Sequence, residues 1–378
     1  MHAAPRASDA YDGAVDPAAS LTLIPLMGPW HLRHPRWNVV TVRDALDALA
    51  PALVWTTALP PDYARDPAWR DTDELALPWT VAPWAARRGT ALRGLAAPGA
   101  EDAPDFERLL ASYPQARAPL DAAHAALRPL HDVLPLALDL PRILTEVVPP
   151  LADELRVRLE AFGDGPGTGW RMRRARAAAK RVAADLGAAG SPGNAGSPGN
   201  AGSPGNAGSP GIAGGPHGAV LVEVDLWPAL ALELDAAGLA WAPPDPPPVT
   251  AEARTRSLLD VAWRGEAADV AGLLGQLGEL DLAEARFLQA QLLLAHDHAA
   301  EALEVLEGAA NGDFHEPYLL PGLLLARLGQ LRDLAGKRDR ALQAYRGALA
   351  LDWAPADARA AAEAGLRAPF ALPAGGPS

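Results

Sequence analysis

A proline-rich segment, residues 243–248 (PPDPPP), separates two stretches of the chain with different sequence patterns. Proline fixes its own backbone angle and donates no hydrogen bond, so a run of prolines acts as a semi-rigid spacer. Before this segment, short apolar runs alternate with stretches of helical spacing, whereas after it only helical spacing recurs. The segment therefore predicts two domains, which a length of 378 residues also favours. We place the linker at residues 245–249.

The part before the linker, residues 20–244, predicts an α/β domain with a small, mostly parallel sheet. Buried strands are expected where apolar or β-branched residues form short runs, and helices where apolar residues recur at helical spacing. The expected strands are residues 21–27, 53–58, 90–95, 219–225 and 239–242, and the expected helices include 41–50, 78–88, 170–186 and 228–237. Thr41 is predicted to cap the first of these helices. Strands that alternate with helices are typical of βαβ units.

The part after the linker, residues 250–370, predicts an all-α domain of helical repeats. Leu325, Leu328 and Gly329, followed by Ala341 and Tyr345, have the residue types and spacing of a tetratricopeptide repeat. Residues 290–309 match the same frame more loosely, and residues 252–280 supply a further helix pair. About three repeats are the minimum for a stable stack. Such a stack predicts a protein or peptide as the binding partner.

Composition limits the other partners and the compartment. The 46 acidic residues outnumber the 33 lysines and arginines, which argues against nucleic acid and against an anionic membrane surface as partners. Without cysteine, disulfides and thiolate metal sites are excluded. No apolar run has the length of a membrane span, and residues 1–19, a predicted disordered leader, lack the pattern of a signal peptide. We therefore expect a cytoplasmic protein.

Glycine recurs at every third position over residues 187–216. This spacing has two interpretations, because a collagen triple helix requires it and a low-complexity flexible loop also permits it. The segment is short, and it interrupts the α/β domain instead of extending from an end. We therefore favour a flexible Gly-x-y insertion that leaves the fold on either side unchanged.

The candidate functional residues are His31, Arg171 and Asp225. His31 follows the first expected strand, and ligands of open α/β sheets bind beyond the carboxyl ends of strands. Its imidazole is suited to acid–base chemistry or to binding a divalent metal, for which Asp225, at the end of a later strand, would be a second ligand. Arg171 would hold an anion. Two alternatives stay open: a loop histidine at position 31 that only bonds the backbone beside Trp30, and an arginine at position 171 that only covers a helix face.

Three motifs in the first domain resemble the TraB/ChaN/Tiki-like superfamily. They are the G-x-x-H sequence at residues 28–31 (GPWH), the arginine-led helix WRMRRARAAAKRV, and the closing strand and helix AVLVEVDLWPALALELDAAG. The resemblance covers roughly residues 20–244. It implies an α/β fold and a family chemistry of metal-dependent peptide cleavage in some members and haem binding in another. The chain departs from the family pattern in having Thr56 and Thr57 where a carboxylate is expected, and Asp225 where a second histidine is expected.

These observations predict an interaction protein that binds its partner through tetratricopeptide-like repeats. In this interpretation the TraB/ChaN/Tiki-like domain is degenerate and has lost catalysis. The alternative is a divalent-metal-dependent hydrolase of peptides or esters, in which the repeats recruit the substrate. In that case His31 and Asp225 would bind the metal, which is the only cofactor expected, and His31 and Arg171 would be the catalytic candidates.

Overall fold

The computed structural model describes residues 21–65, 69–70, 72–96, 106–132, 138–165, 167–189, 217–265, 267, 269–312, 314 and 317–372. The predicted leader, and all of the Gly-x-y segment beyond residue 189, lie outside these residues. The chain forms two compact units. The first contains the described residues of Met1–Met27, Asp44–Tyr63 and Trp84–Pro247, and the second those of Gly28–Arg43, Ala64–Pro83 and Pro248–Ser378.

The first unit is built on a small parallel sheet, as predicted. Its five strands have the order β3-β2-β4-β1-β5, and every pair of neighbours is parallel. The strands are β1 (Leu21–Leu26), β2 (Leu53–Thr56), β3 (Ala91–Gly94), β4 (Gly218–Glu223) and β5 (Trp241–Ala242). All residues of β1 are buried, because helices cover both faces of a parallel sheet.

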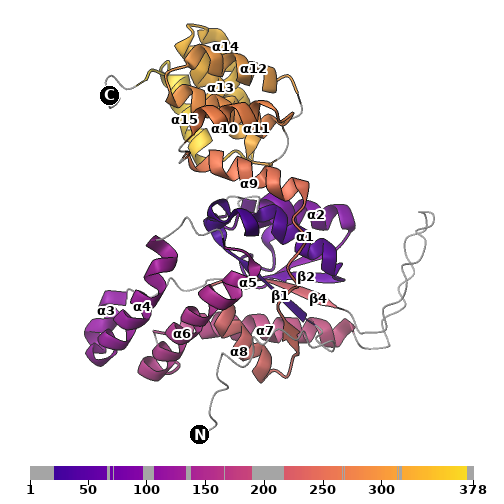
Figure 1. Cartoon of the computed structure of the whole chain (residues 1–378), viewed down its shortest axis with the longest axis vertical. Helices are drawn as coiled ribbons and strands as arrows, with labels where there is room; N and C mark the ends of the chain where they lie inside the picture. The colour runs from indigo at the N-terminus through magenta and orange to yellow at the C-terminus, as the bar shows by residue number, and fades with distance from the viewer. Residues whose placement is uncertain are drawn as a thin grey trace, which may run out of the picture. The chain divides into compact units, whose positions relative to one another are not determined.

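The crossover connections that leave β1 and β4, two neighbouring strands, run in opposite directions along the sheet. From β1 the chain crosses to β2 on one side, whereas from β4 it crosses to β5 on the other side. Right-handed crossovers then place α1 and α8 on opposite faces of the sheet, as Figure 1 shows. The helices that precede the linker are α1 (Val39–Leu49), α2 (Ala82–Arg88), α3 (Phe106–Ser112), α4 (Arg117–Asp132), α5 (Leu140–Arg142), α6 (Val148–Phe162), α7 (Gly169–Ala189) and α8 (Trp227–Ala236).

The second unit is mostly helical, as predicted for the part after the linker. Its helices pack in chain order, each of α10 to α14 against the next along the chain. They are α9 (Ala251–Arg264), α10 (Val270–Gly278), α11 (Ala283–Ala295), α12 (Ala299–Ala309), α13 (Leu320–Leu334), α14 (Arg338–Leu349) and α15 (Ala356–Arg367). Tyr345 is fully buried, and its ring lies where a Cβ on Gly329 or Gly365 would be, so both positions need glycine for this packing.

Two segments that precede the linker also belong to the second unit. The first contains the short helices η1 (Gly28–Arg33) and η2 (Pro35–Trp37), which pack against α9. The second contains the π-helical turn η5 (Leu77–Val81), which runs directly into α2. The π-helical turn and the next helix replace the single helix predicted over residues 78–88.

The predicted cap of the first helix is wrong. The helix begins two residues before Thr41, and the side chain of Asn38 caps it, because its Oδ1 accepts hydrogen bonds from the backbone N–H groups of Val40 and Thr41, both at 3.0 Å. Asparagine is as good a cap as threonine, and the β-branched residues that follow it hid the true start of the helix.

Candidate functional site

The G-x-x-H loop begins with a glycine that its backbone conformation requires. Gly28 has a φ of +57°, in the left-handed region that residues with a Cβ rarely adopt. Its N–H donates a 2.8 Å hydrogen bond to Oε2 of Glu74, a carboxylate 46 residues further along the chain. The turn after β1 therefore directs the chain toward a buried acid that no motif in the sequence had indicated.

His31 is fully buried at the end of this loop. Its Nδ1 lies 2.8 Å from the carbonyl oxygen of Trp37, and since a carbonyl only accepts, Nδ1 carries the proton. Its Nε2 lies 3.4 Å from Oε1 of Glu74, which is ion-pair distance but without hydrogen-bond geometry. Both ring nitrogens of His31 therefore contact the protein.

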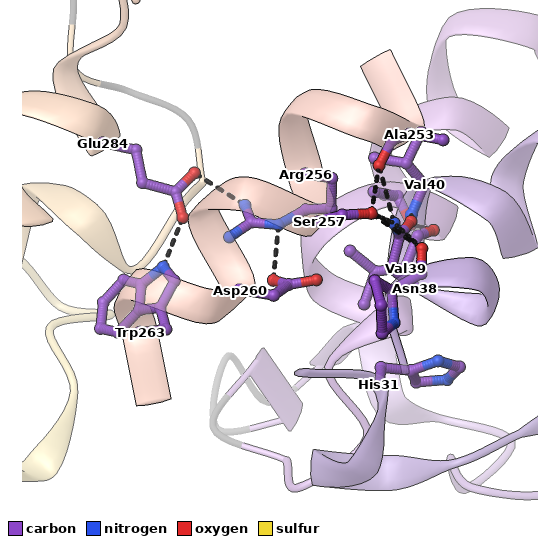
Figure 2. Close-up of polar contacts among 12 residues, drawn as sticks. His31, Asn38, Val39, Val40, Ala253, Arg256, Ser257, Asp260, Trp263 and Glu284 are labelled. Carbon is purple, nitrogen blue, oxygen red and sulfur yellow. Dashed lines mark hydrogen bonds and ion pairs between the residues drawn. The ribbon is translucent and has the colours of Figure 1, made fainter. Parts of the chain in front are cut away.

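Asn38 connects the histidine loop to α9 within the second unit. Besides capping α1, it donates from Nδ2 to the carbonyl oxygens of Pro35 at 3.0 Å and Ala253 at 2.9 Å. Ser257 on α9 donates to the same Pro35 carbonyl at 2.8 Å. Figure 2 shows these bonds beside His31. The bond to Ala253 and the bond from Ser257 thus join the histidine loop to α9.

A buried ionic cluster extends from α9 to α11 in the second unit. Arg256 donates from Nε to Asp260 at 2.7 Å and from Nη1 to Glu284 at 2.8 Å, and Trp263 donates to the other oxygen of Glu284 (Figure 2). The guanidinium also lies 5.0 Å from the ring centre of Trp79. All three charged residues are buried. Burial raises the pKa of Asp260 to about 6, although the Arg256 guanidinium acts in the opposite direction.

Arg171 lies in the first unit, where it contacts another buried carboxylate. Its Nη1 is 3.2 Å from Oε2 of Glu154 on α6, and Arg158 binds the same carboxylate at 2.6 Å. Burial alone would raise the pKa of Glu154, but the two guanidiniums hold it below its usual value. The Arg171 guanidinium also lies 5.3 Å from the ring centre of Trp170. Arg171 therefore holds an anion, and this anion is a side chain of the protein itself.

Asp225 is partly exposed just beyond β4, also in the first unit. The polar contacts at the carboxyl ends of β2 and β4 instead involve Glu223, whose N–H donates to Thr57 at 3.1 Å and whose carboxylate accepts from Arg174 at 2.7 Å. His31 belongs to the second unit. Within the described ranges, no three or more histidine and carboxylate side chains are grouped so that they could hold a metal ion.

Four buried residues of the second unit were missed by sequence reasoning: Glu74, Arg256, Asp260 and Glu284. Arg256 and Asp260 stand four residues apart on one helix, which is a visible ion-pair spacing. Such pairs usually cover solvated helix faces, so the spacing alone gave no indication of burial. Glu74 and Glu284 had no local signal, because their partners are distant in the sequence.

Comparison with protein-family models, curated proteins and solved structures finds no match to this chain. Among the residues that the structure describes, no helix is both long enough and apolar enough to cross a membrane. The candidate function therefore depends on the contacts of the chain's own residues.

Proposed function

We propose that this protein is an interaction protein whose tetratricopeptide-like helices bind a protein or peptide partner. The α/β domain is then a degenerate TraB/ChaN/Tiki-like domain without catalytic activity. The observation that carries the proposal is the packing of α11 to α15 in chain order, with Tyr345 against Gly329 and Gly365. Close approach through small residues is typical of stacked helical repeats, which offer extended surfaces for partners.

One edge of α13 has the chemistry of a binding surface. Leu323, Arg327, Gln330 and Leu334 recur at helical spacing along this edge, and all are half-buried. Burial lowers the pKa of Arg327, although Asp357 and the Tyr345 hydroxyl act in the opposite direction. Among the described carboxylates, none lies within ion-pair distance of this guanidinium. A partly desolvated cation that has no carboxylate at ion-pair distance favours a partner that brings one. We therefore propose an acidic peptide segment as the ligand.

Panning a peptide display library against the immobilised full chain tests this proposal. We expect acidic peptides to be enriched, and Arg327→Glu to weaken their binding at least tenfold, because loss of one charge-assisted hydrogen bond corresponds to about 1.4 kcal/mol or more. Arg346→Glu is the matched control, since Arg346 is exposed on α14 and undergoes the same change of charge. Equal enrichment of neutral peptides would contradict the acidic ligand, and no enrichment at all would contradict the interaction function.

The alternative, a metal-dependent hydrolase, would need His31 and Asp225 to act with further ligands. In the second unit, the two ring nitrogens of His31 contact Trp37 and Glu74. Stoichiometric metal in the purified protein, lost on His31→Ala substitution, would favour the hydrolase over the interaction function.

A further inference from the structure

Asp260 is a buried carboxylate with an incomplete set of hydrogen bonds. It is 1% exposed on α9, and its Oδ1 accepts from Arg256 at 2.7 Å. Its Oδ2 is buried and accepts no hydrogen bond. An ionised carboxylate away from water needs several donors, whereas the neutral acid costs much less to bury with few partners. Burial with a single donor therefore favours the neutral acid form of Asp260 over the carboxylate.

The neighbouring carboxylate, Glu284, competes for the same cation. Arg256 donates to both groups, but Glu284 also accepts from Trp263, so each of its oxygens has a donor. Two buried carboxylates with one guanidinium carry one excess negative charge. In a low-dielectric interior, uptake of a proton is the least costly way to remove that charge. The proton goes to the carboxylate with fewer donors, which is Asp260.

The other ionisable groups around α9 modify this preference without reversing it. On α9 itself Arg256 favours the ionised form of Asp260, as does His31 on η1, whereas Glu284 on α11 disfavours it. Glu74 lies 3.4 Å from His31. η1 also carries Arg33, η2 carries Arg36, and neither α10 nor η5 has an ionisable side chain. Burial exceeds the combined effect of these groups and raises the pKa of Asp260 to about 6.

We propose that Asp260 is a proton-binding site that makes the attachment of α9 within the second unit sensitive to pH. α9 contacts α11 through Arg256 and Glu284, and it contacts the histidine loop through Ala253 and Ser257. A proton on Asp260 removes the excess charge beside these contacts and strengthens them. Loss of the proton restores the charge and weakens them. This proposal does not depend on the proposed function.

The sign of the effect follows from proton linkage. An aspartate whose pKa is about 6 in the folded chain and 3.8 in the unfolded chain binds its proton more tightly when folded. Its contribution to stability is therefore complete below pH 3.8 and is lost as the pH rises through 6. Between these values the folding equilibrium constant falls about 100-fold.

Urea unfolding of the full chain between pH 4 and pH 7.5 tests the proposal. Relative to Asp260→Asn, the wild type should lose about 100-fold in its folding equilibrium constant over this range. Glu252→Gln is the matched control, because Glu252 is an exposed carboxylate on the same helix, 61% exposed, and its removal should leave the wild-type pH dependence unchanged. Parallel pH profiles for the wild type and Asp260→Asn would overturn the proposal.

A local readout covers the case in which Asp260→Asn does not fold. The indole N–H of Trp263 bonds to Glu284, so its NMR signal reports the charge of the cluster. In the wild type this signal should shift with a midpoint near pH 6, and Glu284→Gln should move the midpoint to a lower pH by removing the competing carboxylate. A signal that does not change between pH 5 and pH 7 would overturn the proposal.

Discussion

Each unit of this protein contains a buried ionic cluster, and the two clusters have opposite ratios of charge. In the first unit, Arg158 and Arg171 share the single carboxylate of Glu154. In the second unit, Asp260 and Glu284 share the single guanidinium of Arg256. In both clusters arginine guanidiniums pair with carboxylates, and both central residues are buried. The two clusters therefore differ in their ratio of arginines to carboxylates.

The ratio of arginines to carboxylates determines whether the pKa of each buried acid is raised or lowered. Two cations around Glu154 outweigh its burial and lower its pKa. One cation shared by two acids does not outweigh burial, and the pKa of Asp260 rises to about 6. A buried carboxylate with surplus cations is stabilising at neutral pH, whereas one with a shortage of cations is stabilising in acid. Burial alone thus predicts neither the sign of the pKa shift of a carboxylate nor the pH range in which that carboxylate stabilises the fold.

Removal of the shared guanidinium should have the largest effect on stability. Arg256→Met leaves Asp260 and Glu284 buried without a cation, and we expect unfolding to become easier by about 3–5 kcal/mol. Urea unfolding of the full chain at pH 7 measures this. Arg254→Met on the same helix is the control, because Arg254 is exposed and its loss should change little. Equal effects of the two substitutions would show that the cluster of the second unit contributes no net stability.

Removal of the shared carboxylate should have a smaller effect with the opposite pH dependence. Glu154→Gln leaves two arginines that are each partly exposed and can reach water, so we expect a loss of about 2 kcal/mol at pH 7. Because the pKa of Glu154 is lowered on folding, its contribution is present above pH 4.5 and is lost as the pH falls through the lowered value.

The measurement for Glu154→Gln is its difference in unfolding free energy from the wild type at several pH values. This difference should shrink as the pH falls below 4.5. The difference between Asp260→Asn and the wild type should instead change between pH 4 and pH 6. Similar pH profiles for the two substitutions would contradict the conclusion that the ratio of arginines to carboxylates sets the direction of the pKa shift.

The sequence predicted the small parallel sheet and the helical second half, because both depend on local pattern. β1 is mostly apolar, and Gly28, with positive φ, follows two residues after its end, so its position was visible in the residues themselves. The start of α1 was predicted wrongly, since Asn38 and Thr41 are both good caps and only the structure shows which side chain accepts the bonds. The tetratricopeptide frame and the family resemblance stay predictions.

The candidate site was predictable only in part. His31 was identified from its place after a strand, but its contact with Glu74 joins segments 43 residues apart, and Asn38 contacts Ala253 215 residues away. One sequence gives no signal for such pairs. Asp260 was overlooked for a different reason, since an Arg–Asp pair at four-residue spacing usually lies in solvent. Whether such a pair is buried depends on which helices pack over it, and spacing does not show that.

The smallest expected effect on stability comes from an exposed ion pair, and it tests the role of exposure separately from that of the arginine-to-carboxylate ratio. Arg156 and Arg158 are two residues apart on α6, and each forms an ion pair with a glutamate four residues away, but Arg156 is 58% exposed and Arg158 is 12% exposed. Arg156→Gln should change the unfolding free energy by no more than about 0.5 kcal/mol, because water and salt screen the pair it removes. Arg158→Gln removes a charge-assisted bond to buried Glu154, which keeps Arg171, so we expect a loss of about 1–2 kcal/mol.

Urea unfolding of both variants at low and at high salt measures the two effects, and the small one should be the more sensitive to salt. Equal losses of stability in the two variants would mean that exposure does not distinguish these ion pairs. The difference between the two clusters would then depend on the ratio of arginines to carboxylates alone.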